Sequence, residues 1–320
     1  MKNKLQQHFP MIRTRDEIMA EIKNSEKLQK IFFSWNEAEQ QEFLDFCTGV
    51  RGIKILYDSF FKEILNPELY PERLNELLSL LINQQVKIVS VLPNDSVRIA
   101  DEGSLIITDI VVELEDGSIA NVEIQKIGYN FPGQRSACYS ADLLLRQYKR
   151  IKSKEKKKFS YKDIKTVYTI ILFEKSTKEF HKFLETYIHC FEQRSDSGLQ
   201  INLLQKYIFI SLDIFKKWYQ NNIISNKLDA WLAFLCMDDP DVILTIIDTY
   251  PEFEPMYEQA YDICLNMEEV MGMFSKELYE LDKNTVQYMM DEMQEEIDRR
   301  NADFEEKKKE LQEMKDMLEE

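Results

Sequence analysis

Glycine and proline are scarce in this 320-residue sequence, with eight of each. So few helix breakers, together with 31% charged residues, favour long regular elements, mostly helices, and argue against an all-β or disordered chain. The five cysteines include no CxxC pair, which argues against a zinc site or a disulfide framework. Histidine occurs three times, too seldom for a convincing His-rich metal site.

The sequence also lacks long apolar runs and an excess of basic residues. No run reaches the roughly 18 apolar residues of a membrane span, and the first residues lack the apolar core of a signal peptide. We therefore expect a cytoplasmic protein without a membrane partner. The net charge of −16 argues against a nucleic-acid coat protein, but its distribution is uneven. Residues 146–165 hold ten basic against two acidic residues, and residues 286–320 hold thirteen acidic against six basic residues.

Hydrophobic periodicity divides the chain into four parts. Residues 1–50 and 216–285 read as helical regions, and residues 286–320 read as one acidic helix. Residues 51–215 combine β-rich runs with amphipathic helices, which predicts a mixed α/β sheet core flanked by helices. The predicted strands are 86–92, 105–114, 119–127, 167–173 and 207–214, and helices are expected at 134–151 and 176–193.

The acidic C-terminal segment has an apolar residue at heptad spacing, which indicates an imperfect coiled coil. One interpretation is self-association, as a homodimer, or docking of a partner. The other is a solvated helical tail, since a single exposed helix needs packing to persist. The heptad positions are Val286, Met290, Met293, Ile297, Phe304, Leu311, Met314 and Leu318.

An acidic residue interrupts each strand of a predicted hairpin. Asp109 lies in the apolar run 105–114, and a lone carboxylate inside a strand is costly to bury unless something binds it. Side chains alternate along a strand, so Glu123 and Gln125 share one face of 119–127. A three-residue turn at 116–118 pairs Glu115 with Ile119, which places Asp109 opposite Gln125 with Glu123 on the diagonal.

Two converging carboxylates suit a hard divalent cation. Asp109 and Glu123 would hold Mg²⁺, or Mn²⁺ in its place, because such ions prefer oxygen ligands. The ion can polarise a phosphodiester oxygen and activate a water molecule. Gln125 could orient that water or the phosphate. From the residues alone the alternative stays open that Asp109 is a satisfied core residue and that Glu123 and Gln125 line a solvated strand face.

The helix after the hairpin places Arg135, Tyr139, Asp142 and Arg146 on one stripe. Arg135 is the candidate phosphate ligand, while Arg146 either shares that role or pairs with Asp142. Ala137, Ala141, Leu144, Leu145 and Tyr148 are expected to form the buried side. The basic run that follows predicts either contacts with the DNA backbone or a solvated lysine loop. Its candidate DNA-binding residues are Lys149, Arg150, Lys152 and Lys154.

The order Asp109, Glu123-x-Gln125, Arg135 and Tyr139 resembles that of the PD-(D/E)XK nuclease family transposases and related recombination-promoting nucleases. The segment from Tyr57 to Lys62 also resembles the opening helix of that family, which makes Asp58 and Lys62 secondary site candidates. The resemblance covers about residues 50 to 240. It implies a restriction-endonuclease-like fold and a metal-dependent DNA endonuclease, with Asp109, Glu123 and Gln125 as catalytic residues.

Two positions depart from the wider nuclease pattern. Gln125 stands where that pattern has lysine, and Thr108 rather than proline precedes Asp109. Lys126 is adjacent to Gln125, but strand alternation predicts that it points to the opposite face. A second hypothesis is therefore a catalytically weakened nuclease fold that acts as a coiled-coil interaction module. A nuclease toxin or defence protein would use the same chemistry.

Overall fold

The computed structural model describes residues 2–92, 110–127, 132–155 and 158–319 of the chain. Within these residues a mixed sheet has the strand order β1-β2-β3-β4-β6-β5. Strands β3, β4 and β6 are parallel neighbours, and the other pairs are antiparallel. The strands are β1 (Ile88–Val91), β2 (Ile110–Leu114), β3 (Ile119–Gln125), β4 (Val167–Phe173), β5 (Ile188–Phe191) and β6 (Gln205–Ser211).

The connection from β3 to β4 explains why the centre of the sheet is parallel. Two parallel neighbours need a crossover, and helix α7 (Pro132–Glu155) supplies it. Strand β4 is apolar apart from Tyr168 and Thr169, as expected of a strand whose two faces are both covered by helices. The predicted mixed sheet with flanking helices is therefore confirmed, and β4 has the predicted bounds.

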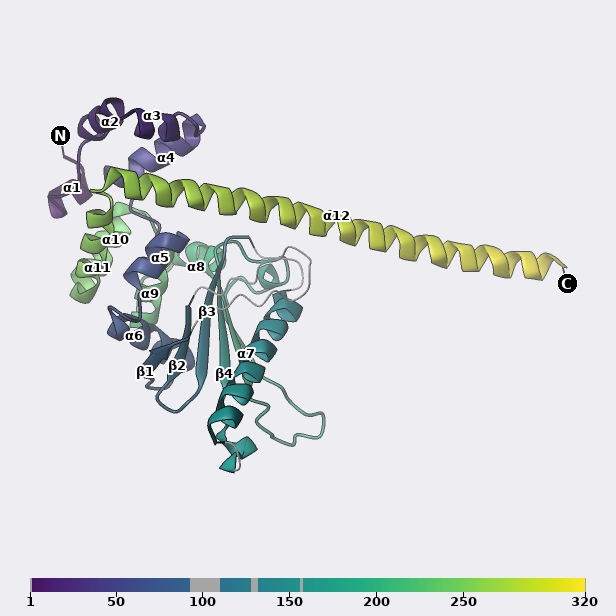
Figure 1. Cartoon of the computed structure of the whole chain (residues 1–320). Helices are drawn as coiled ribbons and strands as arrows, with labels where there is room; N and C mark the ends of the chain where they lie inside the picture. Colours follow the sequence, from purple (N-terminus) through teal and green to yellow (C-terminus); the bar gives the residue numbers. More distant parts are fainter. Residues whose placement is uncertain (1, 93–109, 128–131, 156–157, 320) are drawn as a thin grey trace.

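The two faces of the sheet have different neighbours. Even-numbered β3 residues such as Ala120 and Val122, with Ile170 and Leu172 of β4, enter the main hydrophobic core. Helices α6 (Pro71–Ile82), α8 (Leu212–Tyr219) and α9 (Lys227–Cys236) contribute to the same core. Helix α7 lies against the opposite face (Figure 1). The sheet is thus a central layer between two helical layers.

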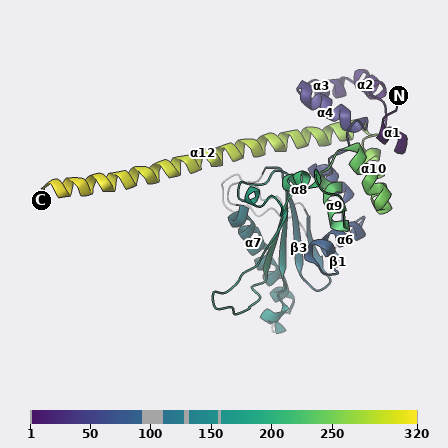
Figure 2. The ribbon, with the colours of Figure 1, turned by 180° about the vertical axis from the view of Figure 1, so that it is seen from behind.

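A helical body continues from the main core at one end of the sheet (Figure 2). One cluster of buried hydrophobic residues includes both Leu5 near the N-terminus and Phe274 of the last helix. The Trp35 and Phe274 rings meet edge-on, with 5.0 Å between their centroids. The N-terminal and C-terminal helices therefore share one core with the sheet. The helices are α1 (Lys4–His8), α2 (Arg15–Asn24), α3 (Glu26–Phe32), α4 (Glu37–Cys47), α5 (Asp58–Ile64), α10 (Pro240–Thr249), α11 (Glu254–Ile263) and the start of α12.

Helix α12 (Met267–Glu319) is a single helix of 53 residues. Its first turns are buried in the helical body, and its C-terminal part projects away from the sheet and the other helices (Figure 1). Between these parts, Glu292 forms an ion pair with Lys178 at 3.7 Å. The predicted acidic helix at 286–320 is thus the outer part of a longer element. Within the part of the chain that the structure describes, no helix is both apolar and long enough to cross a membrane.

Two sequence predictions at the sheet edge are wrong. The segment 176–193 is not a helix: it forms a single 3-10 turn, η3 (Phe180–Lys182), and then strand β5. Antiparallel pairing of β5 with β6, which provides partners for the backbone of this segment, overrides the local helical pattern. The last predicted strand also ends at Ser211, where α8 begins, rather than at Ile214.

Candidate active site

Strand β3 presents three polar side chains on the face that α7 covers. Asn121, Glu123 and Gln125 follow the strand period of two, and they are 0%, 5% and 2% exposed. Three polar residues in succession on a buried strand face are unusual, because each must lose its contact with water. This face is therefore the first place to look for a bound ligand.

Helix α7 closes over this face. Its Leu143 packs with Val111, Ile119 and Val167, one from each of the strands β2, β3 and β4. The Ser140 hydroxyl accepts a hydrogen bond from the Gln205 amide of β6 at 3.1 Å. The polar row on β3 thus lies between the sheet and a helix, partly shielded from solvent, where electrostatic interactions are stronger than in water.

The polar atoms of this face are incompletely satisfied. The Gln125 amide donates to Glu123 Oε1 at 3.1 Å. Among the described residues, no partner is found for Gln125 Oε1 or for the amide of Asn121. The same holds for the buried hydroxyls of Thr169 and Ser211, which belong to β4 and β6. Each such group costs roughly 1–3 kcal/mol when it stays unsatisfied, so these atoms are the candidates of this face for binding a ligand.

The hairpin register keeps the odd-numbered residues of β2 and β3 on one face, as predicted. Val111 pairs with Asn121 and Glu113 with Ile119, so the turn is one residue earlier than the predicted 116–118. The prediction that Glu115 pairs with Ile119 is wrong. Gly117 adopts a left-handed φ of +85°, which glycine tolerates best, and this conformation closes the turn at 115–117. Asp109, which directly precedes β2, lies outside the described residues.

The face that α7 turns to the sheet is more polar than predicted. Its buried residues are Ser136, Tyr139, Ser140, Leu143 and Gln147, whereas the expected Ala137, Ala141 and Leu145 are exposed. The strand face that meets α7 is polar, and the mainly polar face of α7 turns towards it instead of the predicted apolar stripe. Tyr139 is 4% exposed, and its hydroxyl accepts a hydrogen bond from Arg135 Nε. The structure thus brings the predicted Arg135 and Tyr139 together.

Residues 55–293, about three quarters of the chain, match the PD-(D/E)XK nuclease family transposases. The chain belongs to this family. The described sheet and its flanking helices fit the restriction-endonuclease-like fold expected of a PD-(D/E)XK nuclease. Comparison with curated proteins and with solved structures gave no match. The family supports a nuclease-type function for this chain.

The lysine next to the Glu-x-Gln pair of this PD-(D/E)XK protein points to the other face of β3, as predicted. Lys126 is 7% exposed, and its ammonium group lies 2.6 Å from Glu277 and 3.4 Å from Glu174. It also donates to the Leu56 carbonyl. Lys126 is therefore committed to a buried ion-pair cluster and does not replace the lysine of the wider nuclease pattern.

The basic residues of α7 divide into two groups. Arg150 pairs with Glu113 of β2 at 2.9 Å, and Lys152 donates to the Tyr148 hydroxyl at 2.7 Å. Lys149 and Lys154 are exposed. Arg146 forms an ion pair with Asp142 at 2.7 Å, which favours the surface-pair interpretation for that arginine. Lys152 is also exposed, but its ammonium group is already hydrogen-bonded, so Lys149 and Lys154 are the better placed of the four candidates for a phosphate backbone.

The secondary candidates belong to α5. Asp58 forms ion pairs with Lys62 at 2.6 Å and with Lys276 of α12 at 3.1 Å, and its backbone N–H donates to Glu277. Burial raises the pKa of the Asp58 carboxyl, but the two ammonium groups outweigh burial and lower it overall. These contacts connect α5 to α12, so the partners of Asp58 hold two helices together.

No group of three or more His, Cys, Asp or Glu side chains within the described residues is arranged to hold a metal ion. Glu123 is the one member of the predicted metal pair that the structure describes. Sequence reasoning missed Thr169 and Ser211, although each is a polar residue at an odd position within or directly after an apolar run. The polarity of these two positions relates them to the row on β3 only when the register of the parallel strands is known. In that register Asn121 pairs with Thr169 and Phe173 pairs with Ser211.

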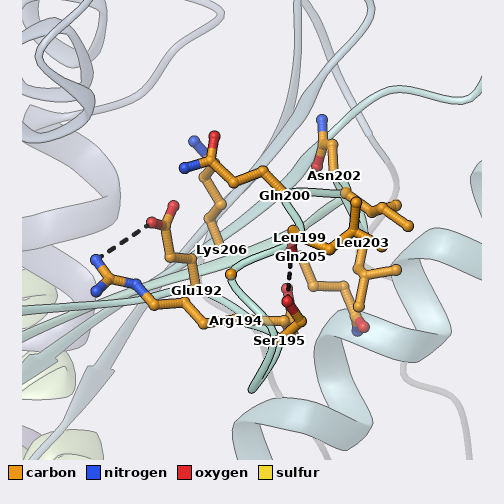
Figure 3. A pocket seen from close by; sticks show the side chains of 12 residues that line it. Glu192, Arg194, Ser195, Leu199, Gln200, Asn202, Leu203, Gln205 and Lys206 are labelled. Carbon is orange, nitrogen blue, oxygen red and sulfur yellow. Dashed lines mark hydrogen bonds and ion pairs between the residues drawn. The ribbon is translucent and has the colours of Figure 1, made fainter.

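A hollow of about 620 Å³ lies away from the polar row, in the loop between β5 and β6 (Figure 3). The loop is held by a hydrogen bond from the Ser195 hydroxyl to the Leu199 carbonyl at 2.8 Å and by a Glu192–Arg194 ion pair at 3.8 Å. Most of its lining is exposed, and the lining contains neither Glu123 nor Gln125. This hollow is therefore separate from the candidate active site.

Proposed function

We propose that this PD-(D/E)XK family member is a Mg²⁺-dependent DNA endonuclease whose active site is the polar face of β3 together with Asp109. The observation that carries the proposal is the buried Glu123 carboxylate, hydrogen-bonded to Gln125 and surrounded by oxygen atoms without partners among the described residues. In a family of nucleases, such a row is the natural place for a metal ion and a phosphodiester.

The donor set fits a hard cation. The available groups are a carboxylate from Glu123, amide oxygens from Asn121 and Gln125, and hydroxyls from Thr169 and Ser211. All are oxygen ligands, which Mg²⁺ and Mn²⁺ prefer over nitrogen or sulfur. Asp109 directly precedes Ile110, and Ile110 pairs with Val122. The proposal requires that pairing to continue by one residue, which would set the Asp109 and Glu123 carboxylates side by side.

When bound there, the ion supplies positive charge that polarises a phosphodiester oxygen and makes a water molecule easier to deprotonate. Asp109 and Glu123 hold the ion in place. Gln125, which is uncharged, orients the water or the phosphate through its amide. Arg135, held by Tyr139, neutralises a phosphate beside the site. Lys149 and Lys154 contact the DNA backbone without reading its sequence.

Nicking of a supercoiled plasmid by the purified full chain tests the proposal. Wild type should nick the plasmid with Mg²⁺ or Mn²⁺ and leave it intact with EDTA. Glu123→Gln should lower the rate about 100-fold or more, since one preorganised charge at a reacting centre contributes that much. Glu115→Gln, an exposed acid in the same hairpin, is the matched control and should cleave at the wild-type rate. Equal activity of wild type and Glu123→Gln would reject the proposed site.

A second candidate function is supported by the outer part of α12. The heptad residues Val286, Met290, Met293, Ile297 and Phe304 are each between 48% and 65% exposed. Such a row on a projecting helix fits self-association or partner docking, and the chain would then act as an interaction module on a nuclease fold. An intact plasmid with every divalent ion, together with a self-associating chain, would favour this alternative.

A further inference from the structure

A second hollow, of about 540 Å³, opens beside the proposed active site. The sheet contributes His189 and Phe191 from β5 and Tyr207 and Phe209 from β6, and the segment around η3 contributes Phe180 and Phe183. The first residues of α7, Pro132 and Gly133, complete its wall with Ala137. Its volume is that of an ordinary ligand pocket, and rings make up most of its lining.

The strand register links this hollow directly to the polar row on β3. Glu123 pairs with Ile171, Ile171 with Phe209, and Phe209 with His189. The neighbouring row runs in the same way from Asn121 to Phe191. These aromatic residues therefore occupy the same sheet face as Glu123. Tyr207 and Phe209 lie two strands away and His189 and Phe191 three strands away, which is roughly 10 and 14 Å at normal strand spacing.

Two of the rings are available to a ligand. Phe183 and Phe191 are 58% and 48% exposed, and both contact the His189 ring, with centroids 5.7 and 6.4 Å away. Phe180 and Phe209 are buried beneath them. Large exposed aromatic side chains around a concave surface are costly to leave in water, and they offer flat faces for stacking.

The hollow also has polar groups at its edge. His189 Nε2 is buried and has no hydrogen-bond partner among the described residues. The Glu179 carboxylate, which lines the same hollow, is exposed and can accept hydrogen bonds. Lys182 is exposed next to Phe183, and Arg135 follows Gly133 by two residues. Flat apolar walls, a few hydrogen-bonding groups and nearby cations are together the features that bind a nucleotide.

We propose that this hollow binds an unpaired nucleobase next to the phosphodiester that is cut. This inference rests on the proposed nuclease function and narrows its substrate to DNA with a single-stranded segment at the cleavage point. The faces of a base inside a duplex are covered by its neighbours, so a stacking pocket can take only a base that has left the stack. Phe183 and Phe191 stack on the base, while His189 and Glu179 face its polar edge.

The test uses a single-stranded oligodeoxynucleotide with one 2-aminopurine and the full chain in EDTA, so that binding is measured without cleavage. Wild type should quench the 2-aminopurine fluorescence as the base stacks. Phe183→Ala and Phe191→Ala should each weaken binding roughly 5- to 150-fold, the usual effect of removing a stacking ring. Phe191→Tyr should retain binding. Phe33→Ala removes a ring of similar exposure that follows α3 and should bind as wild type does.

Wild-type binding by Phe183→Ala and Phe191→Ala, or no quenching by wild type, would overturn the inference. A sedimentation coefficient of the two variants below that of wild type would also overturn it, because a second copy of the chain would then occupy the hollow in the wild-type protein. The result is independent of the plasmid assay. Quenching that needs both rings, from a chain that never nicks DNA, would leave the base site standing and remove the endonuclease proposal. Plasmid nicking without ring-dependent quenching would remove the base site and leave the endonuclease proposal standing.

Discussion

Lys126 Nζ lies 2.6 Å from Glu277 Oε1, and both side chains are less than a tenth exposed. The pair joins the residue after β3 to the helical body at the start of α12. The pair lies on the opposite face of the strand from Glu123. The buried cluster of Lys126, Glu174 and Glu277 therefore holds the strand on the face away from the candidate site. The start of α12 is thereby anchored at the strand that carries Glu123.

Replacing Lys126 should destabilise the protein strongly. Lys126→Met leaves the buried Glu277 carboxylate without its nearest cation, which costs about 3–5 kcal/mol in the free energy of unfolding. The double variant Lys126→Met, Glu277→Leu should recover more than half of that loss, because the most deeply buried carboxylate is removed with its cation and only the less buried Glu174 loses a partner. Urea unfolding followed by circular dichroism measures both.

A solvent-exposed pair provides the comparison. Lys30 and Glu26 are 2.8 Å apart, with side chains 75% and 84% exposed, and Lys30→Met should cost less than about 1 kcal/mol. If Lys126→Met cost no more than Lys30→Met, the cluster would not anchor the strand.

Asp58 should make stability fall in acid. Burial opposes its ionisation, but Lys62 and Lys276 hold the pKa of its carboxyl below the usual 3.8. A lowered folded pKa means that ionised Asp58 stabilises the fold. That stabilisation is complete above the unfolded pKa and disappears as pH falls through the lower folded pKa. Asp58→Asn should therefore lower the unfolding free energy by about 1 kcal/mol at pH 7.

The difference between Asp58→Asn and wild type should shrink as the pH falls below about 4. Urea titrations across this acid range follow it, with Asp303→Asn on the exposed part of α12 as the control. A difference that stays constant down to the acid limit would show that the Asp58 charge is not responsible.

The two groups of basic residues on α7 should behave differently towards DNA. Lys149→Ala with Lys154→Ala should reduce the slope of log affinity against log salt by about 0.9 for each phosphate that these lysines neutralise in the wild type. Arg150→Ala should leave that slope nearly unchanged, because Arg150 is already paired with Glu113. Fluorescence anisotropy at several salt concentrations separates the two. A larger change in slope from Arg150→Ala than from the lysines would reverse the assignment.

The heptad row of α12 should mediate self-association. Ile297→Asp places a charge in the centre of the exposed apolar row and should shift the chain towards monomer in sedimentation velocity. Asn301→Asp adds the same charge outside the row and should leave association unchanged. A wild-type chain that is monomeric at every accessible concentration would leave α12 as a solvated helix.

Local patterns predicted much of the fold. The hairpin, the buried run of β4 and the long helix α7 follow from alternation, turn residues and helical periodicity within single segments. Strand β5 was missed because its conformation depends on pairing with β6 rather than on its own sequence. The buried face of α7 was misassigned for a related reason, since its partner is a polar strand face.

The candidate site was predicted in part. Strand alternation alone placed Glu123 with Gln125 and separated them from Lys126, and the structure has both features. Thr169 and Ser211 could not be assigned, because the register between parallel strands is fixed by the crossover and not by neighbouring residues. The partner of Lys126 lies about 150 residues further along the chain, where no local pattern reaches.

Binding of Mn²⁺ to the full chain tests the central claim most directly. Free Mn²⁺ gives a strong electron paramagnetic resonance signal that is lost on binding, so a titration measures affinity without any nuclease assay. Wild type should bind Mn²⁺, and Asp109→Asn and Glu123→Gln should each weaken that binding more than about tenfold, whereas Glu115→Gln should not. Unchanged Mn²⁺ affinity in both Asp109→Asn and Glu123→Gln would contradict the assignment of the metal to this face of β3.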